Sequence, residues 1–370
     1  MPNKSNALLK SFVSELQNST GCAAIATQTE VPFVLQDKTH HLDALVRMSQ
    51  PIGDEFDIAV EILGRAYPRD ILHVMNQLHK WRATADEGQQ IVLAVVAEYL
   101  SPGAKAELKE AGICYYDGGS SMYFRHRTYL VSRELVGKRP PPRRSVRLFS
   151  GAREQVVHAL LEHWRQTKGT EYIGGTELAN RSETSTYTVS STMQELEREN
   201  WIDATGSGPA LRRRLRDPAG LLDAWAHDWA LRKEHATRWY IYAKTNPADA
   251  VLWSLRNHVG DGWAITGAAA ANAVVPHLTS VDRVQIVVPP GETKDWAEKL
   301  QLKPAEKGSN VMLIERTGAA LMFLDEHPER PGSRFASRFI QYLDLLDGYG
   351  RNKELAEEYR RAALGIRAKV

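Results

Sequence analysis

The chain has 370 residues, of which 43% are hydrophobic and 25% charged, and a formal net charge of +2. This composition is typical of soluble globular proteins with two or three domains, and the small charge means that any nucleic-acid affinity must come from local basic patches. The two cysteines, Cys22 and Cys114, have no metal-ligand spacing, which excludes a disulfide framework and a cysteine zinc site. Because no stretch has the pattern of a signal peptide or a bilayer span, we expect a cytoplasmic protein without membrane contact.

Residues 1–135 predict an α/β domain. An opening amphipathic helix places its apolar side chains on one face, at Leu8, Leu9, Phe12, Val13 and Leu16. Short stretches rich in Val, Ile and Phe then predict three strands, at 31–35, 42–46 and 56–63. The domain continues with a helix beginning at Pro68, a doubly covered strand at 91–96, a helix after Ser101 and a strand at 113–116.

This order of helix, three strands, helix, strand, helix and strand resembles the core of the PD-(D/E)xK restriction-endonuclease-like superfamily. The resemblance implies a Mg²⁺ site with Asp43 as the first acid and Glu61 as the second. Leu63 stands where the superfamily has a lysine, and an aliphatic side chain supplies no charge. Lys80 on the following helix is a possible substitute. We therefore expect an inactive scaffold, with an active nuclease as the alternative.

Basic residues crowd the segment from 125 to 150. Residues 136–150 are predicted to be a linker, because three prolines at 140–142 favour an extended polyproline conformation. Three of its arginines, Arg143, Arg144 and Arg147, are candidate phosphate contacts. A solvated, purely solubilising linker is the alternative.

Residues 151–216 have the pattern of a winged helix-turn-helix. A first helix has one apolar face, formed by Val156, Val157, Leu160, Leu161 and Trp164. A short second helix covers 176–180, with Leu178 and Ala179 facing inward. Thr184 or Ser185 could cap a third helix, in which Val189, Met193 and Leu196 share the inner face. Two strands at 201–205 and 211–215 then predict a wing.

The polar residues of this segment are candidates for DNA contact. The third helix carries hydrogen-bonding side chains that can reach base edges in a major groove: Ser185, Thr186, Tyr187, Thr188, Ser190, Ser191, Gln194 and Arg198. The second wing strand supplies Arg212, Arg213, Arg214 and Arg216 for phosphates or the minor groove. Strand alternation predicts that Leu211, Arg213 and Leu215 share one side. A protein-interaction module is the alternative.

Residues 217–370 predict a second α/β domain. A helix from Pro218 carries Trp225 and Trp229, which we expect to be core residues packed back on the winged helix. Strands are predicted at 239–243, 284–288, 311–314 and 321–324. Helices are predicted after Pro247, over 262–274 in a run of small residues, around Phe339 and from Asn352.

Three stretches of this region resemble the AbiEi-type antitoxin family of type IV toxin–antitoxin systems: 265–270, 283–288, and 342–346 ahead of Arg351 and Glu354. The resemblance implies a transcriptional regulator that represses its own operon through a winged helix. It also implies a nucleotidyltransferase-like C-terminal fold that counters a toxin encoded nearby. In familiar members the winged helix is N-terminal, whereas here it lies in mid-chain.

An active nucleotidyltransferase needs a Gly-Ser or Gly-Gly turn and two or three carboxylates. Here Gly267 and Ala268 occupy the turn without a hydroxyl, and Asp282 precedes a strand that lacks a second acid. We therefore expect no transfer chemistry, no catalytic residue and no cofactor.

The sequence as a whole predicts an α/β multidomain protein: a restriction-endonuclease-like domain, a central winged helix and a nucleotidyltransferase-like domain. We expect a non-enzymatic, sequence-specific regulator of a bacterial mobile element or toxin–antitoxin-like operon, bound to double-stranded DNA as a homodimer. The alternatives are a Mg²⁺-dependent nuclease targeted by the winged helix and an antitoxin that acts by binding a toxin protein.

Overall fold

The computed structural model describes residues 2–35, 38–51, 53–85, 90–119, 121–127, 129–134, 147–243, 246–255, 262–327, 330–347 and 349–367. By their internal contacts the residues divide into two compact units. The first unit comprises 1–146 together with 196–200, and the second comprises 147–195 together with 201–370. Each unit is described by itself.

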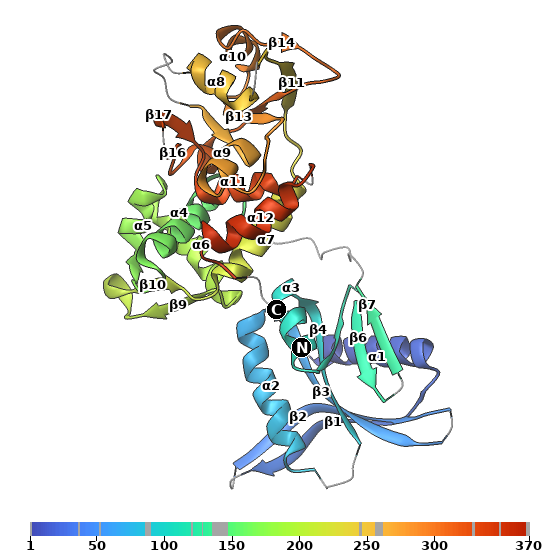
Figure 1. Ribbon diagram of the computed structural model, residues 1–370. Helices are drawn as coiled ribbons and strands as arrows, with labels where there is room; N and C mark the ends of the chain where they lie inside the picture. The colour runs from blue at the N-terminus through green and yellow to red at the C-terminus, as the bar shows by residue number, and fades with distance from the viewer. Residues whose placement is uncertain are drawn as a thin grey trace. The chain divides into compact units, whose positions relative to one another are not determined.

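The first unit is built on a seven-stranded sheet in which the strands follow chain order (Figure 1). Its elements are α1 (Pro2–Thr20), β1 (Ala23–Leu35), β2 (Lys38–Ser49), β3 (Glu55–Ala66), α2 (Pro68–Arg82), β4 (Ile91–Leu100), α3 (Pro102–Glu110), β5 (Cys114–Asp117), β6 (Met122–His126) and β7 (Tyr129–Arg133). Strands β3, β4 and β5 are parallel, and the strands on either side of them are antiparallel. The predicted order of helices and strands through β5 is confirmed.

Alternation along β3 gives the sheet two buried faces. Phe56, Ile58 and Val60 join one hydrophobic cluster, which includes Phe12 of α1. Ala59 joins the other cluster, which α2 and α3 cover. A strand covered on both sides must be apolar at almost every position, and this explains the continuous run in β4.

The hairpin of β6 and β7 was not predicted. The sequence pattern assigned residues from 125 onward to a basic connector, but the structure places them in strands that end the sheet. Two of the arginines pair within the unit, Arg127 with Asp54 at 2.7 Å and Arg133 with Glu15 at 2.7 Å. Their charges are therefore committed to acids of the same unit.

The second unit begins with three helices and a small sheet. The elements are α4 (Gly151–Thr167), β8 (Ile173–Gly174), α5 (Gly175–Arg181), α6 (Thr186–Arg198), β9 (Ile202–Thr205), the 3₁₀ turn η1 (Gly208–Ala210) and β10 (Arg212–Leu215). The strand order is β8-β10-β9, and both pairings are antiparallel. The three predicted helices and the two predicted strands are confirmed, with β8 as an addition.

A seven-stranded sheet with the order β14-β11-β15-β13-β12-β17-β16 forms the rest of this unit. Its strands are β11 (Ala236–Tyr240), β12 (Ala264–Thr266), β13 (Val284–Val288), β14 (Lys303–Pro304), β15 (Val311–Glu315), β16 (Asp325–His327) and β17 (Arg330–Phe335). Its helices are α7 (Pro218–Ala230), α8 (Pro247–Leu255), α9 (Gly267–Val274), α10 (Thr293–Lys299), the 3₁₀ turn η2 (Gly318–Leu321), α11 (Arg338–Leu345) and α12 (Asn352–Ala362).

Two predicted elements of this region were wrong. The small-residue helix over 262–274 is a strand, β12, followed by α9, and Gly267 makes the turn between them with φ +62°. Three buried residues between two neighbouring strands are too few to show a period of two. The strand predicted at 321–324 is instead the end of η2 and a turn, and pairing resumes only in β16. Strand β11 also lies three residues earlier than predicted.

Both tryptophans of α7 are buried, as expected for core residues. Asp217 caps this helix by accepting a hydrogen bond from the Gly220 amide at 2.9 Å. Throughout the described part of the chain, none of the helices has the length and apolar content needed to cross a membrane.

Candidate nucleic-acid interface

Helix α6 has one buried and one exposed face. Val189, Met193 and Leu196 are buried, as their spacing predicted. The start of the helix is fixed by Ser185, whose side chain accepts a hydrogen bond from the Thr188 amide at 3.1 Å. Ser185 is thus the cap, and its hydroxyl also contacts that of Thr188 at 2.9 Å.

The outer face of α6 presents polar side chains to solvent. Tyr187 is 80% exposed, and Thr186, Ser190 and Gln194 are exposed with it. Ser191 is half-buried, because its hydroxyl donates to the Thr188 carbonyl at 3.0 Å. Arg198 is exposed in the last turn, within the residues that group with the first unit. An exposed tyrosine among hydroxyl and amide side chains has the chemistry needed to read base edges.

The arginines of β10 differ in exposure along the strand. Arg212 and Arg216 are exposed, whereas Arg213 is only 9% exposed and lies on the side of buried Leu215. The predicted alternation is confirmed. It also corrects the candidate set, because a buried guanidinium cannot reach a phosphate, and we leave Arg213 out of the interface.

Two of the other arginines share one acid. Arg214 lies 3.3 Å from Asp203 of β9 and 4.8 Å from the centre of the Tyr172 ring, and Arg216 lies 4.0 Å from the same carboxylate. Among the described residues Arg212 has no ion pair, so its charge is fully available. Arg147 is exposed just before α4, and Arg143 and Arg144 lie outside the described residues.

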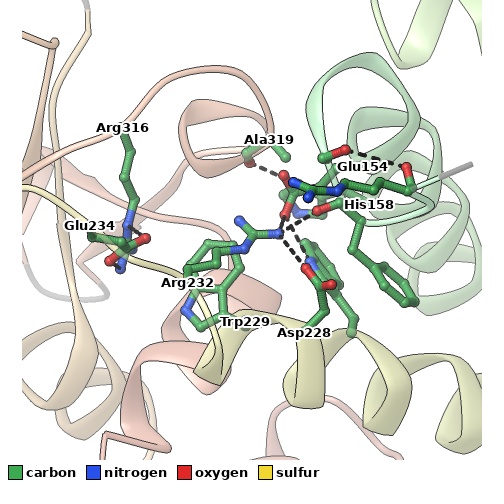
Figure 2. Close-up of polar contacts among 12 residues, drawn as sticks. Glu154, His158, Asp228, Trp229, Arg232, Glu234, Arg316 and Ala319 are labelled. Atoms are coloured by element: carbon green, nitrogen blue, oxygen red, sulfur yellow. Dashed lines mark hydrogen bonds and ion pairs between the residues drawn. The ribbon is translucent and has the colours of Figure 1, made fainter. Parts of the chain in front are cut away.

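The inner face of α4 carries buried polar groups that attach the three-helix segment to the rest of its unit (Figure 2). Glu154 accepts a hydrogen bond from the Trp225 indole at 2.9 Å and pairs with Arg232. Burial raises the pKa of Glu154, and the charge of Arg232 opposes that rise. Arg232 is held further by the Phe149 carbonyl and by stacking at 4.2 Å on Trp229.

His158 is fully buried one turn farther along α4. Its ring nitrogens contact the Ala319 carbonyl at 3.0 Å and the Ser337 hydroxyl at 2.7 Å. Burial lowers the pKa of His158 to about 3, so the ring is neutral at physiological pH. The contacts fix α4 on η2 and on the first residue before α11. Sequence analysis missed both Glu154 and His158, although polar residues beside a predicted apolar helix face were a visible signal.

A second polar network lies where α7 meets the larger sheet. Arg316 pairs with Glu234 at 2.6 Å and with Asp344 at 2.8 Å, and it stacks at 4.7 Å on Trp229. Asp344 also accepts hydrogen bonds from the Trp229 indole and the Thr266 hydroxyl. The labelled side chains of Figure 2 show Arg316 beside Glu234 and Arg232 beside Trp229. These contacts join α7, β15 and α11 through buried charge.

The first unit brings its two predicted acids together. Asp43 on β2 accepts a hydrogen bond from the Ile62 amide at 2.7 Å, and Glu61 on β3 accepts one from the Gln77 amide group at 2.9 Å. Burial raises the pKa of Glu61 to about 8, and the neighbouring Asp43 charge adds to the effect. Gln77 was missed, although it is a polar residue beside the apolar stripe of α2.

The acids fit a Mg²⁺ ion only in part. Leu63 packs against the apolar cluster beneath α2, and exposed Lys80 has no contact with Glu61. The described residues include no group of three His, Cys, Asp or Glu side chains placed to hold a metal ion. Two carboxylates without a nearby cation or third ligand do not define a working metal centre.

The nucleotidyltransferase-type positions lie on α9 and β13. Gly267 and Ala268 begin α9, and Asp282 is exposed before the strand. Gln285 lies on β13, where a second acid would be needed, and it is buried.

Comparison with known proteins gives one family and two structures. Residues 214–364 match the family described as "Transcriptional regulator, AbiEi antitoxin, Type IV TA system". A repair endonuclease from Pyrococcus abyssi is similar at 16% identity and a TM-score of 0.22, over 30% of this chain and 46% of that one. EndoMS in its apo form is similar at 15% identity and a TM-score of 0.21, over 30% and 44%. The chain thus spans less than half of either structure. No curated protein matches it.

Proposed function

We propose that residues 151–216 form a winged helix that binds double-stranded DNA and that the protein is a transcriptional regulator of the AbiEi antitoxin type. The observation that carries the proposal is the exposed polar face of α6 in the same unit as the basic strand β10. The family match at 214–364 supports the regulatory role. The mechanism is occlusion: α6 enters the major groove, and the bound protein blocks the promoter.

Each part of the interface has a separate task. Tyr187, Ser190 and Gln194 contact base edges and give sequence preference. Arg212 and Arg216 contact phosphates and give affinity that falls with salt. Arg214 positions the strand, because it is held by Asp203 and Tyr172. A two-fold symmetric site would engage a homodimer, and a toxin protein would bind the α/β part of the second unit.

The test is fluorescence anisotropy with the full chain, using the duplex upstream of its own gene and a shuffled duplex at 50 and 200 mM KCl. We expect tighter binding to the upstream duplex at both salt concentrations and weaker binding to both duplexes at 200 mM. Equal affinity for the two duplexes would contradict sequence-specific regulation. Absence of binding to either would contradict the winged-helix assignment.

A second candidate function is a Mg²⁺-dependent nuclease, favoured by the contact between Asp43 and Glu61. It ranks second because Leu63 supplies no cation. The test is incubation of supercoiled plasmid with the protein and Mg²⁺, using Glu61→Ala and, as a matched control on the same strand, exposed Glu55→Ala. Cutting that Glu61→Ala abolishes and Glu55→Ala retains would establish the nuclease. Intact plasmid would remove it.

A further inference from the structure

A cavity of about 220 Å³ lies in the second unit, between the start of α9, the segment leading into β13 and the loop that follows α11. Ala268, Leu278 and Val281 give it apolar walls, and Asp282, Gln285 and Asp347 supply polar atoms. Its volume exceeds that of a 150 Å³ cavity that holds benzene and is smaller than typical sites for drug-sized ligands. An occupant would therefore have the size of one ring system.

Gln285 leaves a buried acceptor at this cavity without a partner. The side chain is 7% exposed, and its Oε1 atom makes no hydrogen bond within the described part of the chain. Its other end is used, because Nε2 donates to Asp347 Oδ2 at 3.3 Å. A buried acceptor without a donor is costly, so this atom calls for an N–H or O–H group from an occupant.

The orientation of the Gln285 amide is set by its neighbour. Asp347 is an acceptor, and its other oxygen already receives the Tyr349 amide at 2.8 Å and the Asn352 side chain at 3.0 Å. A rotated amide would place Oε1 against the Asp347 carboxylate, which would be repulsive. The unpaired Oε1 is therefore fixed on the side toward Gly267, where an added Cβ would lie 1.9 Å from it. Glycine at this position keeps that space open.

A flat cationic surface lies among the cavity-lining residues. The Arg283 guanidinium is stacked on the Tyr349 ring, with 3.9 Å between Cζ and the ring centre. Guanidinium planes stack on planar heteroaromatic rings as well as on phenol rings. The lining carries two acids, Asp282 and Asp347, and two arginines, Arg283 and Arg351, so its formal charge is balanced. The balance favours a neutral ligand over an ion.

We propose that this cavity is a binding site for a small, neutral, planar heteroaromatic ligand with an N–H donor, of the nucleobase class, whose donor pairs with Gln285 Oε1. The ligand binds without any bond being made or broken. The assignment is independent of DNA binding, because every residue that supports it lies between 267 and 352 of the second unit.

The test is isothermal titration of the full chain with adenosine, guanosine and cytidine at millimolar concentration. The matched probe is purine riboside, which is adenosine without the exocyclic amino group. We expect at least one amino nucleoside to bind with one-to-one stoichiometry. If that nucleoside is adenosine, purine riboside should bind about tenfold more weakly, because the donor to Gln285 is lost. For guanosine or cytidine, the comparison uses the corresponding nucleoside without its amino group.

Two variants locate the site. Ala268→Leu adds volume inside the cavity without touching Gln285 and should abolish binding, whereas Ala273→Leu makes the same change on α9 at a residue outside the lining and should retain it. Circular dichroism of both variants shows whether the fold is kept. Gln285→Leu should reduce binding of the amino nucleoside to that of its deaminated analogue. No heat with any of the three nucleosides, equal affinity for a nucleoside and its analogue, or equal binding by both alanine variants would each overturn the proposal.

Discussion

Helices α4 and α6 both carry polar side chains, but the two sets have opposite surroundings. Glu154 and His158 of α4 are buried and have partners on α7, η2 and the residue before α11. Tyr187 and Gln194 of α6 are exposed to solvent. The same residue types therefore serve stability in one helix and are available for recognition in the other. Exposure and pairing distinguish the two uses, whereas sequence spacing alone does not.

Removing the anchor of α4 should give the largest effect. Glu154→Ala leaves the Arg232 charge and the Trp225 indole without their shared acceptor, and we expect a loss of about 3–5 kcal/mol in the free energy of unfolding. Urea denaturation measures it. Gln194→Ala is the matched change on α6 and should alter stability by less than about 0.5 kcal/mol. Equal losses in both variants would contradict the comparison.

The second effect is a pH dependence that comes from His158. Its pKa is about 3 in the folded state and about 6.5 when unfolded, so the unfolded chain binds the extra proton as pH falls below 6.5. Stability from this group is complete above pH 6.5 and is lost at about 1.4 kcal/mol per pH unit below it, or about 2 kcal/mol at pH 5.

Urea denaturation at pH 5 and pH 7 checks this dependence. His158→Gln should have a smaller difference between the two pH values than the wild type. His227→Gln, at an exposed histidine of α7, should keep the wild-type difference. An unchanged difference in His158→Gln would show that its ring is protonated in the folded protein.

A third effect concerns the buried acid of the first unit. Glu61 has a pKa of about 8 when folded and about 4.5 when unfolded, so the unfolded chain releases its proton first and stability falls as pH rises from 4.5 to 8. Glu61→Gln should therefore stabilise the unit by about 1–3 kcal/mol at pH 7.5 and by almost nothing at pH 4.5. Denaturation in EDTA at the two pH values measures the gain. A gain of equal size at both would contradict the assigned pKa.

The smallest effect separates neighbouring arginines of β10. Arg212→Ala should lower the slope of log affinity against log salt by about one unit without loss of stability, because it removes one exposed phosphate contact. Arg213→Ala should leave that slope unchanged and lower stability, because its side chain is buried. Anisotropy over a salt series, together with denaturation of each variant, distinguishes them. A reversed pattern would mean that β10 faces DNA with its other side.

The sequence predicted those parts of the fold that repeat over several turns or strands. The apolar stripes of α1, α2, α4 and α6 and the continuous run of β4 show a clear period or length. It failed at Ala264–Thr266, where three buried residues show no period, and at Leu321–Leu324, where an apolar run lies in a turn. Short strands depend on partners that are distant in the chain.

The candidate sites show the same division. Alternation along β10 predicted that Arg213 lies with Leu215, but not that Asp203 would hold Arg214. The spacing of Asp43 and Glu61 placed two acids on neighbouring strands, whereas Gln77 joins them from a helix through tertiary packing. Gln285 shows the limit most clearly, because its unpaired oxygen follows from Asp347, 62 residues later in the chain.

The measurement that tests the central claim most directly is the affinity of wild type and Gln194→Ala for the upstream and shuffled duplexes. Gln194 is exposed on α6, and its removal should cost about 1–3 kcal/mol of binding free energy on the upstream duplex and nothing on the shuffled one. The ratio of the two affinities should therefore fall by about tenfold or more. An unchanged ratio, or an equal loss on both duplexes, would contradict base reading by α6.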